Sequence, residues 1–273
     1  MSHKTRILSA LWMIPLAVLA ILYLPTPYFG AVMALILMAG LYEWAALANV
    51  QNKVHKLLYL LFNAAIFALI AFLDNPSHLV LKLCASMGGI FWLLCLFWLW
   101  QFNFARAPNA FNRFLKLSAG SLACIALWAA MIWLHSSAQG PIWTLIAIGV
   151  IAAADSGAYV FGVNFGKNKL APNISPGKSW EGFWGGLVCA IILALICMQF
   201  MGTSASAWKF AVLGLLTGLF SVVGDLLESL LKRHAAIKDS SSLIPGHGGL
   251  LDRLDSILSG VVIFTLVKFW LGL

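Results

Sequence analysis

The chain is dominated by apolar runs that are about as long as a membrane is thick. Its 273 residues are 62% hydrophobic, whereas soluble domains are typically about 45–50% apolar. A helix that crosses the hydrocarbon core of a bilayer needs about 20 mostly apolar residues. Runs of this kind occur at residues 7–24, 28–48, 57–74, 79–101, 117–135, 141–163, 183–201, 207–230 and 254–272. The sequence therefore predicts an integral membrane protein with about nine transmembrane helices.

The expected fold class is all-α, a polytopic membrane helix bundle. A membrane barrel is disfavoured because its strands alternate apolar and polar residues over about ten positions, whereas these runs are continuous. The first run follows Lys4 and Arg6 and has no small-residue cleavage site after it, so we expect a retained helix rather than a signal peptide. We expect residues 1–140 to form a membrane scaffold and residues 141–273 a catalytic region, within one integrated domain.

Basic residues predict the orientation of the bundle. With the N-terminus in the cytoplasm, three Lys residues fall on the outer side, at Lys82, Lys209 and Lys268, and the other fourteen Lys and Arg residues fall on the cytoplasmic side. This asymmetry follows the positive-inside rule. It also accounts for the net charge of +8 without a nucleic-acid partner, since basic loops suit anionic lipid headgroups. Short loops without a targeting extension favour a bacterial plasma (inner) membrane.

Acidic residues are concentrated near the C-terminus. Seven of the nine lie between residues 155 and 255, while Glu43 and Asp74 stand apart and are interpreted as structural or interfacial. The five cysteines lie inside apolar runs without a CxxC pair, which is typical of core residues. Functional chemistry is therefore expected in the C-terminal half.

Two polar stripes flank the last long loop. Asp225, Glu228 and Lys232 recur at helical spacing near the end of one run, and Asp252 and Asp255 recur at the start of the next. Intramembrane charges cost on the order of 2.5–3.5 kcal/mol each by insertion scales, so the stripes should face protein or water rather than lipid. The loop between the two runs can bring the two stripes together.

Converging carboxylates need a counter-charge. Asp225, Asp252 and Asp255 would repel one another, and Mg²⁺ with oxygen ligands and substrate phosphates relieves that repulsion. Two alternatives stay open at this point: an ion or proton relay, and Asp252 as a simple cap of the last helix. His247 in the glycine-rich loop is by itself more typical of a structural hydrogen-bonding residue than of a ligand.

A second polar stretch runs from Asp155 to Gly182. It is rich in glycine and contains Lys167, Lys169 and Lys178, whose charges suit a polyphosphate. The stretch lacks the GxxxxGK[ST] spacing of a Walker A loop. An ordinary basic cytoplasmic loop is the alternative interpretation.

These two polar regions resemble a known family. The run SLLKRHAAIKDSSSLIPGHGGLLDRLD, residues 229–255, resembles the signature of phosphatidate cytidylyltransferases, also called CDP-diacylglycerol synthases. The upstream run AYVFGVNFGKNKLAPNISPGKSWEG, residues 158–182, resembles that family's other characteristic region. The resemblance covers roughly residues 150–260, whereas the first 140 residues match only in being hydrophobic.

The resemblance implies a reaction of phospholipid biosynthesis: CTP and phosphatidate give CDP-diacylglycerol and pyrophosphate at the cytoplasmic side of the membrane. It implies Mg²⁺ held by Asp225, Asp252 and Asp255, with a monovalent ion such as K⁺ as a second metal, and a homodimer. The candidate catalytic residues are Asp225, Lys232, Lys238, Asp239, Asp252, Arg253 and Asp255. The candidate substrate-binding residues are Asp155, Lys167, Ser175, Lys178, Glu181, His247, Gly248 and Gly249.

Two alternative functions remain. A CTP-dependent transferase acting on a polyprenyl or ether lipid would share the nucleotide and metal motifs. An ion-coupled transporter would use the same intramembrane carboxylates, but transporters commonly place broken helices in two matching halves, and here the polarity is confined to one end of the chain.

Overall fold

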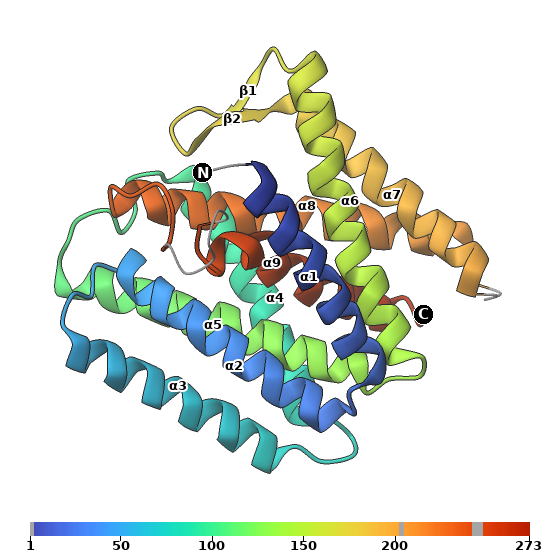
Figure 1. Cartoon of the computed structure of the whole chain (residues 1–273), viewed down its shortest axis with the longest axis horizontal. Helices are drawn as coiled ribbons and strands as arrows, with labels where there is room; N and C mark the ends of the chain where they lie inside the picture. Colours follow the sequence, from blue (N-terminus) through green and yellow to red (C-terminus); the bar gives the residue numbers. More distant parts are fainter. Residues whose placement is uncertain (1–2, 202–204, 242–247) are drawn as a thin grey trace.

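A computed structural model describes the backbone of residues 3–201, 205–241 and 248–273, and side chains from residue 12 onward within these ranges. This part of the chain contains nine α-helices and one two-stranded antiparallel sheet (Figure 1). The helices are α1 (His3–Tyr23), α2 (Thr26–Leu47), α3 (Lys53–Leu73), α4 (Leu79–Trp100), α5 (Ala110–His135), α6 (Gly140–Phe165), α7 (Trp180–Met201), α8 (Ala207–His234) and α9 (Leu251–Trp270).

Each predicted apolar run coincides with one helix, which confirms the all-α polytopic bundle. The largest difference concerns α5, which begins at Ala110 rather than at residue 117. Its N-cap is Asn109, whose side chain accepts a hydrogen bond from Asn112 N at 2.7 Å. The polar first turns of α5 lack the hydrophobicity that marks a membrane span, so hydropathy alone placed the helix start too late.

Helices α2 through α8 are each long and apolar enough to cross a membrane. The last helix, α9, is more polar because it carries Asp252, Arg253, Asp255 and Lys268. It packs against α8, α5, α4 and α6, with further contacts to α2, so most of its surface faces protein. A helix enclosed by other helices tolerates charges that a lipid-facing helix would not.

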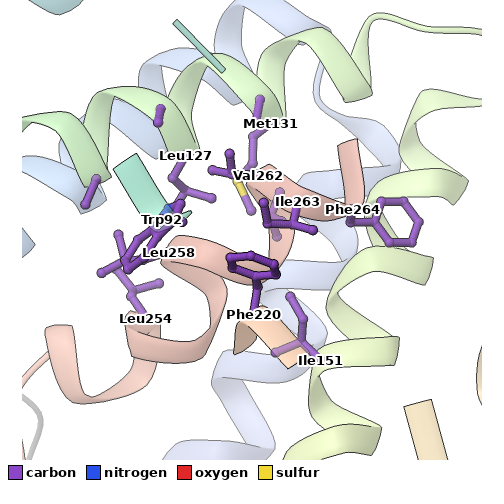
Figure 2. Close-up of a cluster of buried hydrophobic side chains, with 14 of the residues drawn as sticks. Trp92, Leu127, Met131, Ile151, Phe220, Leu254, Leu258, Val262, Ile263 and Phe264 are labelled. Atoms are coloured by element: carbon purple, nitrogen blue, oxygen red, sulfur yellow. The ribbon is translucent and has the colours of Figure 1, made fainter. Parts of the chain in front are cut away.

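The hydrophobic core surrounds α9. Leu258 and Val262 of α9 pack in one buried cluster with Trp92 of α4, Leu127 of α5 and Phe220 of α8 (Figure 2). This cluster joins helices from both halves of the chain. By contrast, α3 lies at the outer edge of the bundle, with few buried positions (Figure 1).

The polar stretch between α6 and α7 forms a β-hairpin, whereas its sequence predicts only a loop. Strands β1 (Lys169–Ala171) and β2 (Ser175–Ser179) pair antiparallel, with Ala171 opposite Ser175. The hairpin projects beyond the ends of α6 and α7 (Figure 1). Arg233 Nε of α8 donates a hydrogen bond to the Ile174 carbonyl at 3.1 Å, so the turn of the hairpin is tied to the helix bundle.

Candidate functional site

A cavity of about 540 Å³ lies where the hairpin meets the ends of α6, α7, α8 and α9. Its charged lining residues come from four separate elements of the chain: Asp155, Lys178, Asp225, Asp252 and Asp255. Ser179 and Ser256 add hydroxyl groups, and Ala158, Val163, Leu170, Phe183 and Val222 supply apolar walls. The two polar regions of the sequence therefore share one pocket, with charge and apolar surface side by side.

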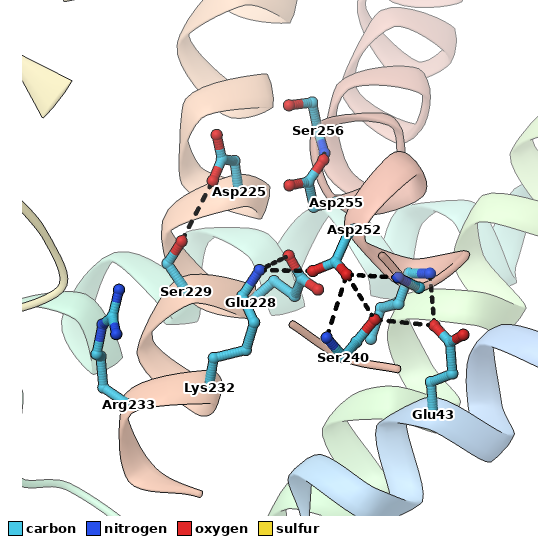
Figure 3. Close-up of polar contacts among 12 residues, drawn as sticks. Glu43, Asp225, Glu228, Ser229, Lys232, Arg233, Ser240, Asp252, Asp255 and Ser256 are labelled. Atoms are coloured by element: carbon cyan, nitrogen blue, oxygen red, sulfur yellow. Dashed lines mark hydrogen bonds and ion pairs between the residues drawn. The ribbon is translucent and has the colours of Figure 1, made fainter. Parts of the chain in front are cut away.

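Close packing of α8 against α9 places two of the aspartates. Gly224 sits directly against the backbone carbonyl of Asp255 and the hydroxyl of Ser259, where an added Cβ would overlap both. Only a residue without a side chain allows the two backbones to approach this closely. The next residue, Asp225, and Asp255 consequently lie near each other across the helix interface (Figure 3).

Lys178 of the hairpin forms an ion pair with Asp225 of α8. Lys178 Nζ lies 2.6 Å from Asp225 Oδ2, and both side chains are about one-quarter exposed, at 24% and 26%. Ser229 Oγ donates to the other oxygen of Asp225 at 3.4 Å. The pocket thus contains a cation from its own chain beside one of the predicted metal ligands.

Asp155 and Asp255 meet at the first turns of α9. Ser256 Oγ donates to Asp155 Oδ1 at 3.3 Å, and Ser256 N donates to Asp255 Oδ1 at 2.7 Å. Ser256 therefore holds a carboxylate from α6 next to one from α9. Asp155, Asp225 and Asp255 gather negative charge at one end of the pocket.

Asp252 belongs to a buried network that includes Lys232 and Glu228 of α8 (Figure 3). Lys232 Nζ donates to Asp252 Oδ1 at 2.7 Å and to Glu228 Oε2 at 2.9 Å. Glu228 is 1% exposed. One ammonium thus offsets two carboxylates whose burial would otherwise be strongly unfavourable.

The second oxygen of Asp252 organises the loop before α9. Asp252 Oδ2 accepts hydrogen bonds from Gly249 N at 2.7 Å, from Ser240 N at 3.1 Å and from Ser240 Oγ at 3.0 Å. The bond from Gly249 N resembles the helix-capping role that was one of the two interpretations of this residue. Asp252 thus connects the loop to α8 through Lys232.

Glu43 of α2 is part of the same network, although its position in the sequence predicts only a structural or interfacial residue. Its carboxylate accepts a hydrogen bond from Ser240 Oγ (Figure 3). It also accepts hydrogen bonds from Ser241 Oγ, Leu250 N and Leu251 N. These partners lie about 200 positions away in the sequence. No local pattern could have revealed them, and the only signal was an acidic residue inside an apolar run.

The donor chemistry of the pocket suits a hard divalent cation, because its charged ligands are carboxylate oxygens rather than thiols or imidazoles. The positions of these carboxylates suit a metal ion less well than their chemistry does. Among the side chains of residues 12–201, 205–241 and 248–273, no three His, Cys, Asp or Glu residues form a group that could hold a metal ion. Lys178 stands beside Asp225, and Lys232 stands beside Asp252.

The remaining predicted site residues lie around the pocket rather than in its lining. Glu181 accepts hydrogen bonds from Lys167 N at 3.1 Å and from Asn168 Nδ2 at 2.8 Å, so it fastens the base of the hairpin. Ser175 begins β2. The side chains of Lys167, Lys238, Asp239 and Arg253 are exposed.

The loop glycines lie against the Asp252 network. Gly248 approaches the Asp252 carboxylate, and a Cβ on Gly249 would overlap Ser240 Oγ and approach Glu43 Oε2. His247 lies outside the described residues. The glycines are thus placed where a side chain would push the loop away from Asp252.

Comparisons with known proteins identify the family of the chain. The model of the family described as "Cytidylyltransferase family" matches residues 4–270. A Haemophilus influenzae protein named phosphatidate cytidylyltransferase is 34% identical over 287 aligned positions, covering 98% of this chain and 99% of the relative.

Two further relatives carry the same name. The Pseudomonas aeruginosa protein is 34% identical over 274 positions, covering 98% of each chain. The Staphylococcus saprophyticus protein is 40% identical over 151 positions, covering 54% of this chain and 58% of the relative. Since the family model spans nearly the whole sequence, the chain belongs to the cytidylyltransferase family.

Proposed function

We propose that this protein is a phosphatidate cytidylyltransferase, which converts CTP and phosphatidate to CDP-diacylglycerol and pyrophosphate. The observation that carries the proposal is the shared pocket: Asp155 and Lys178 from one polar region line it together with Asp225, Asp252 and Asp255 from the other. Relatives that match along nearly their full length bear this name.

The mixed lining of the pocket suits two substrates of different polarity. Its apolar wall residues, such as Val163 and Phe183, can contact the acyl chains of a lipid, and Lys178 can contact phosphate oxygens. A lipid substrate keeps its chains in hydrocarbon while its phosphate reaches the headgroup level. The membrane helices therefore serve to present one substrate to the other.

The chemistry is a phosphoryl substitution. An ionised phosphate oxygen of phosphatidate attacks the α-phosphorus of CTP, the new P–O bond forms, and the bond to the β-phosphate oxygen breaks with release of pyrophosphate. Catalysis of this kind relies on positioning and on neutralising charge at the phosphoryl oxygens. Lys178 and Lys232 are the cations nearest the pocket carboxylates, and we assign them to anion neutralisation.

Mg²⁺ is part of the proposal. The proposal rests on the oxygen-donor chemistry of the pocket and on the family resemblance, because the described carboxylates form no ready three-ligand group. Asp225, Asp252 and Asp255 would hold the ion once substrate phosphates draw Lys178 and Lys232 away from Asp225 and Asp252, and the bound ion would supply Lewis-acid stabilisation of phosphate oxygens. A monovalent ion such as K⁺ is proposed as a second metal on the family resemblance alone.

Location and assembly are also proposed. The fourteen-to-three distribution of basic residues supports a pocket facing the cytoplasm in a bacterial plasma membrane. A homodimer follows from the family resemblance, and crosslinking in native membranes would test it.

The test uses purified protein in detergent–lipid micelles with phosphatidate, Mg²⁺ and CTP labelled at the α-phosphate. We expect label to enter the lipid and unlabelled pyrophosphate to be released. A chelator should stop the reaction, and Mg²⁺ should restore it. Parallel reactions with a polyprenyl phosphate and an ether-linked phosphatidate separate the alternative lipids. Absence of labelled product with every lipid would refute the proposal.

A further inference from the structure

Glu43 joins the N-terminal half of the chain to the loop that precedes α9. The carboxylate is 2% exposed. Oε1 accepts from Leu250 N at 3.0 Å and from Ser241 Oγ, while Oε2 accepts from Leu251 N at 2.7 Å and from Ser240 Oγ at 3.0 Å. Both oxygens are therefore fully used by one short segment of the chain.

Two of these donors are backbone groups at the start of α9. The first N–H groups of a helix have no partner within the helix, and the N-terminal end of the helix dipole favours a negative charge. The N-cap residue of α9, Leu250, has no side chain that could accept these hydrogen bonds. Glu43 therefore supplies from another helix the acceptors for Leu250 N and Leu251 N that the side chain of Leu250 cannot provide.

Ser240 connects Glu43 to Asp252. Its hydroxyl lies 3.0 Å from Glu43 Oε2 and 3.0 Å from Asp252 Oδ2. A serine hydroxyl has one proton to donate, so at any instant it donates to one of the two carboxylates while it lies beside the other. Gly249 packs against both Ser240 and Glu43, so that a Cβ atom at position 249 would overlap Ser240 Oγ and Glu43 Oε2. The contact between Ser240 and Glu43 is therefore tightly packed.

We infer that Glu43 is a positioning residue for the nucleotide-binding site. It acts through Ser240 and the start of α9 to hold Asp252, and with Asp252 the ammonium of Lys232, in the orientation that the reaction needs. The inference rests on the proposed function for its kinetic consequence. The structural half is a clamp between Glu43 of α2 and four residues near the start of α9: Ser240, Ser241, Leu250 and Leu251. This clamp stands independently of any activity.

The experiment compares three single variants of the full-length protein in the same detergent–lipid micelles. Glu43→Gln keeps the shape but replaces one acceptor oxygen with a donor, Glu43→Asp keeps the charge on a shorter side chain, and Asp74→Asn is the control. Asp74 is the other acidic residue of the first 140 residues, and it pairs with His78 rather than with the loop.

We expect Glu43→Gln to lower kcat/KM for CTP by about 10–100-fold, the range typical of residues that orient a ligand-binding group. The KM for phosphatidate should stay near the wild-type value. Glu43→Asp should recover part of the loss, and Asp74→Asn should retain wild-type kinetics. Wild-type kcat/KM for CTP in Glu43→Gln, or a loss of the same size in Asp74→Asn, would overturn the positioning role.

The rate of backbone amide hydrogen exchange tests the clamp in the absence of substrate. The amides of Leu250 and Leu251 should exchange slowly in the wild-type protein and in Asp74→Asn, and faster in Glu43→Gln, while amides in the middle of α9 stay protected in all three. Fast exchange of Leu250 and Leu251 in the wild-type protein would refute the clamp. If the wild-type protein makes no CDP-lipid, the proposed function fails, and the exchange data still decide whether the clamp exists.

Discussion

Lys178 Nζ of the β-hairpin lies 2.6 Å from Asp225 Oδ2 of α8. The two residues come from the two polar regions of the sequence, 47 positions apart by their numbers, and both line the pocket. A hairpin lysine beside a candidate metal ligand is placed to exchange its carboxylate partner for a phosphate when nucleotide binds. This pairing motivates the first prediction.

Lys178→Met should weaken CTP binding. Loss of the hairpin cation removes a charge that neutralises triphosphate, so we expect KM for CTP to rise roughly tenfold, equivalent to about 1.4 kcal/mol. Lys178→Arg keeps the charge with a different donor geometry and should be intermediate. Steady-state kinetics at fixed phosphatidate and Mg²⁺ measure the effect, and an unchanged KM in Lys178→Met would remove this residue from the nucleotide site.

Asp225→Asn and Asp255→Asn should each lower kcat by at least about 100-fold, the usual scale for removing one preorganised electrostatic contact. Each change removes a negative charge from the pocket while keeping the side-chain shape. Helicity by circular dichroism and elution in detergent should match the wild-type protein. Near-normal turnover in both variants would show that these carboxylates do not hold the metal.

Lys232→Met should destabilise the protein strongly. It leaves the buried carboxylates of Glu228 and Asp252 without their shared ammonium, and breaking a buried pair from one side costs about 3–5 kcal/mol. The double variant Lys232→Met/Glu228→Gln removes one of the stranded charges and should recover part of the thermal stability. Thermal unfolding in detergent measures both, and a double variant less stable than Lys232→Met would contradict the network.

Gly224→Ala should separate α8 from α9. The added methyl group meets the Asp255 carbonyl and Ser259 Oγ, so one helix must shift at a cost of about 1–3 kcal/mol, and turnover should fall with the displacement of Asp225 from Asp255. Gly149→Ala in α6 is the matched control, because its methyl group would meet only Leu193 at an ordinary 3.6 Å. Equal activity in the two variants would argue against the close approach.

The helices could be predicted from sequence because a bilayer allows the backbone only a few kinds of secondary structure. A backbone in hydrocarbon must satisfy its hydrogen bonds internally, so each apolar run of about 20 residues became one helix. The short strands Lys169–Ala171 and Ser175–Ser179 could not be predicted in the same way. They are polar and too short to show an alternating pattern, and contacts with Arg233 and Glu181 hold the hairpin in place.

The membrane bundle and the two polar regions could be recognised from the sequence, because hydropathy and motif spacing are local properties. Which charged side chains meet depends on how distant parts of the chain fold together. Glu43 was a lone acidic residue in an apolar run until the fold brought it to Leu250 and Leu251, since a buried carboxylate takes its hydrogen-bond donors from wherever the chain folds back to it.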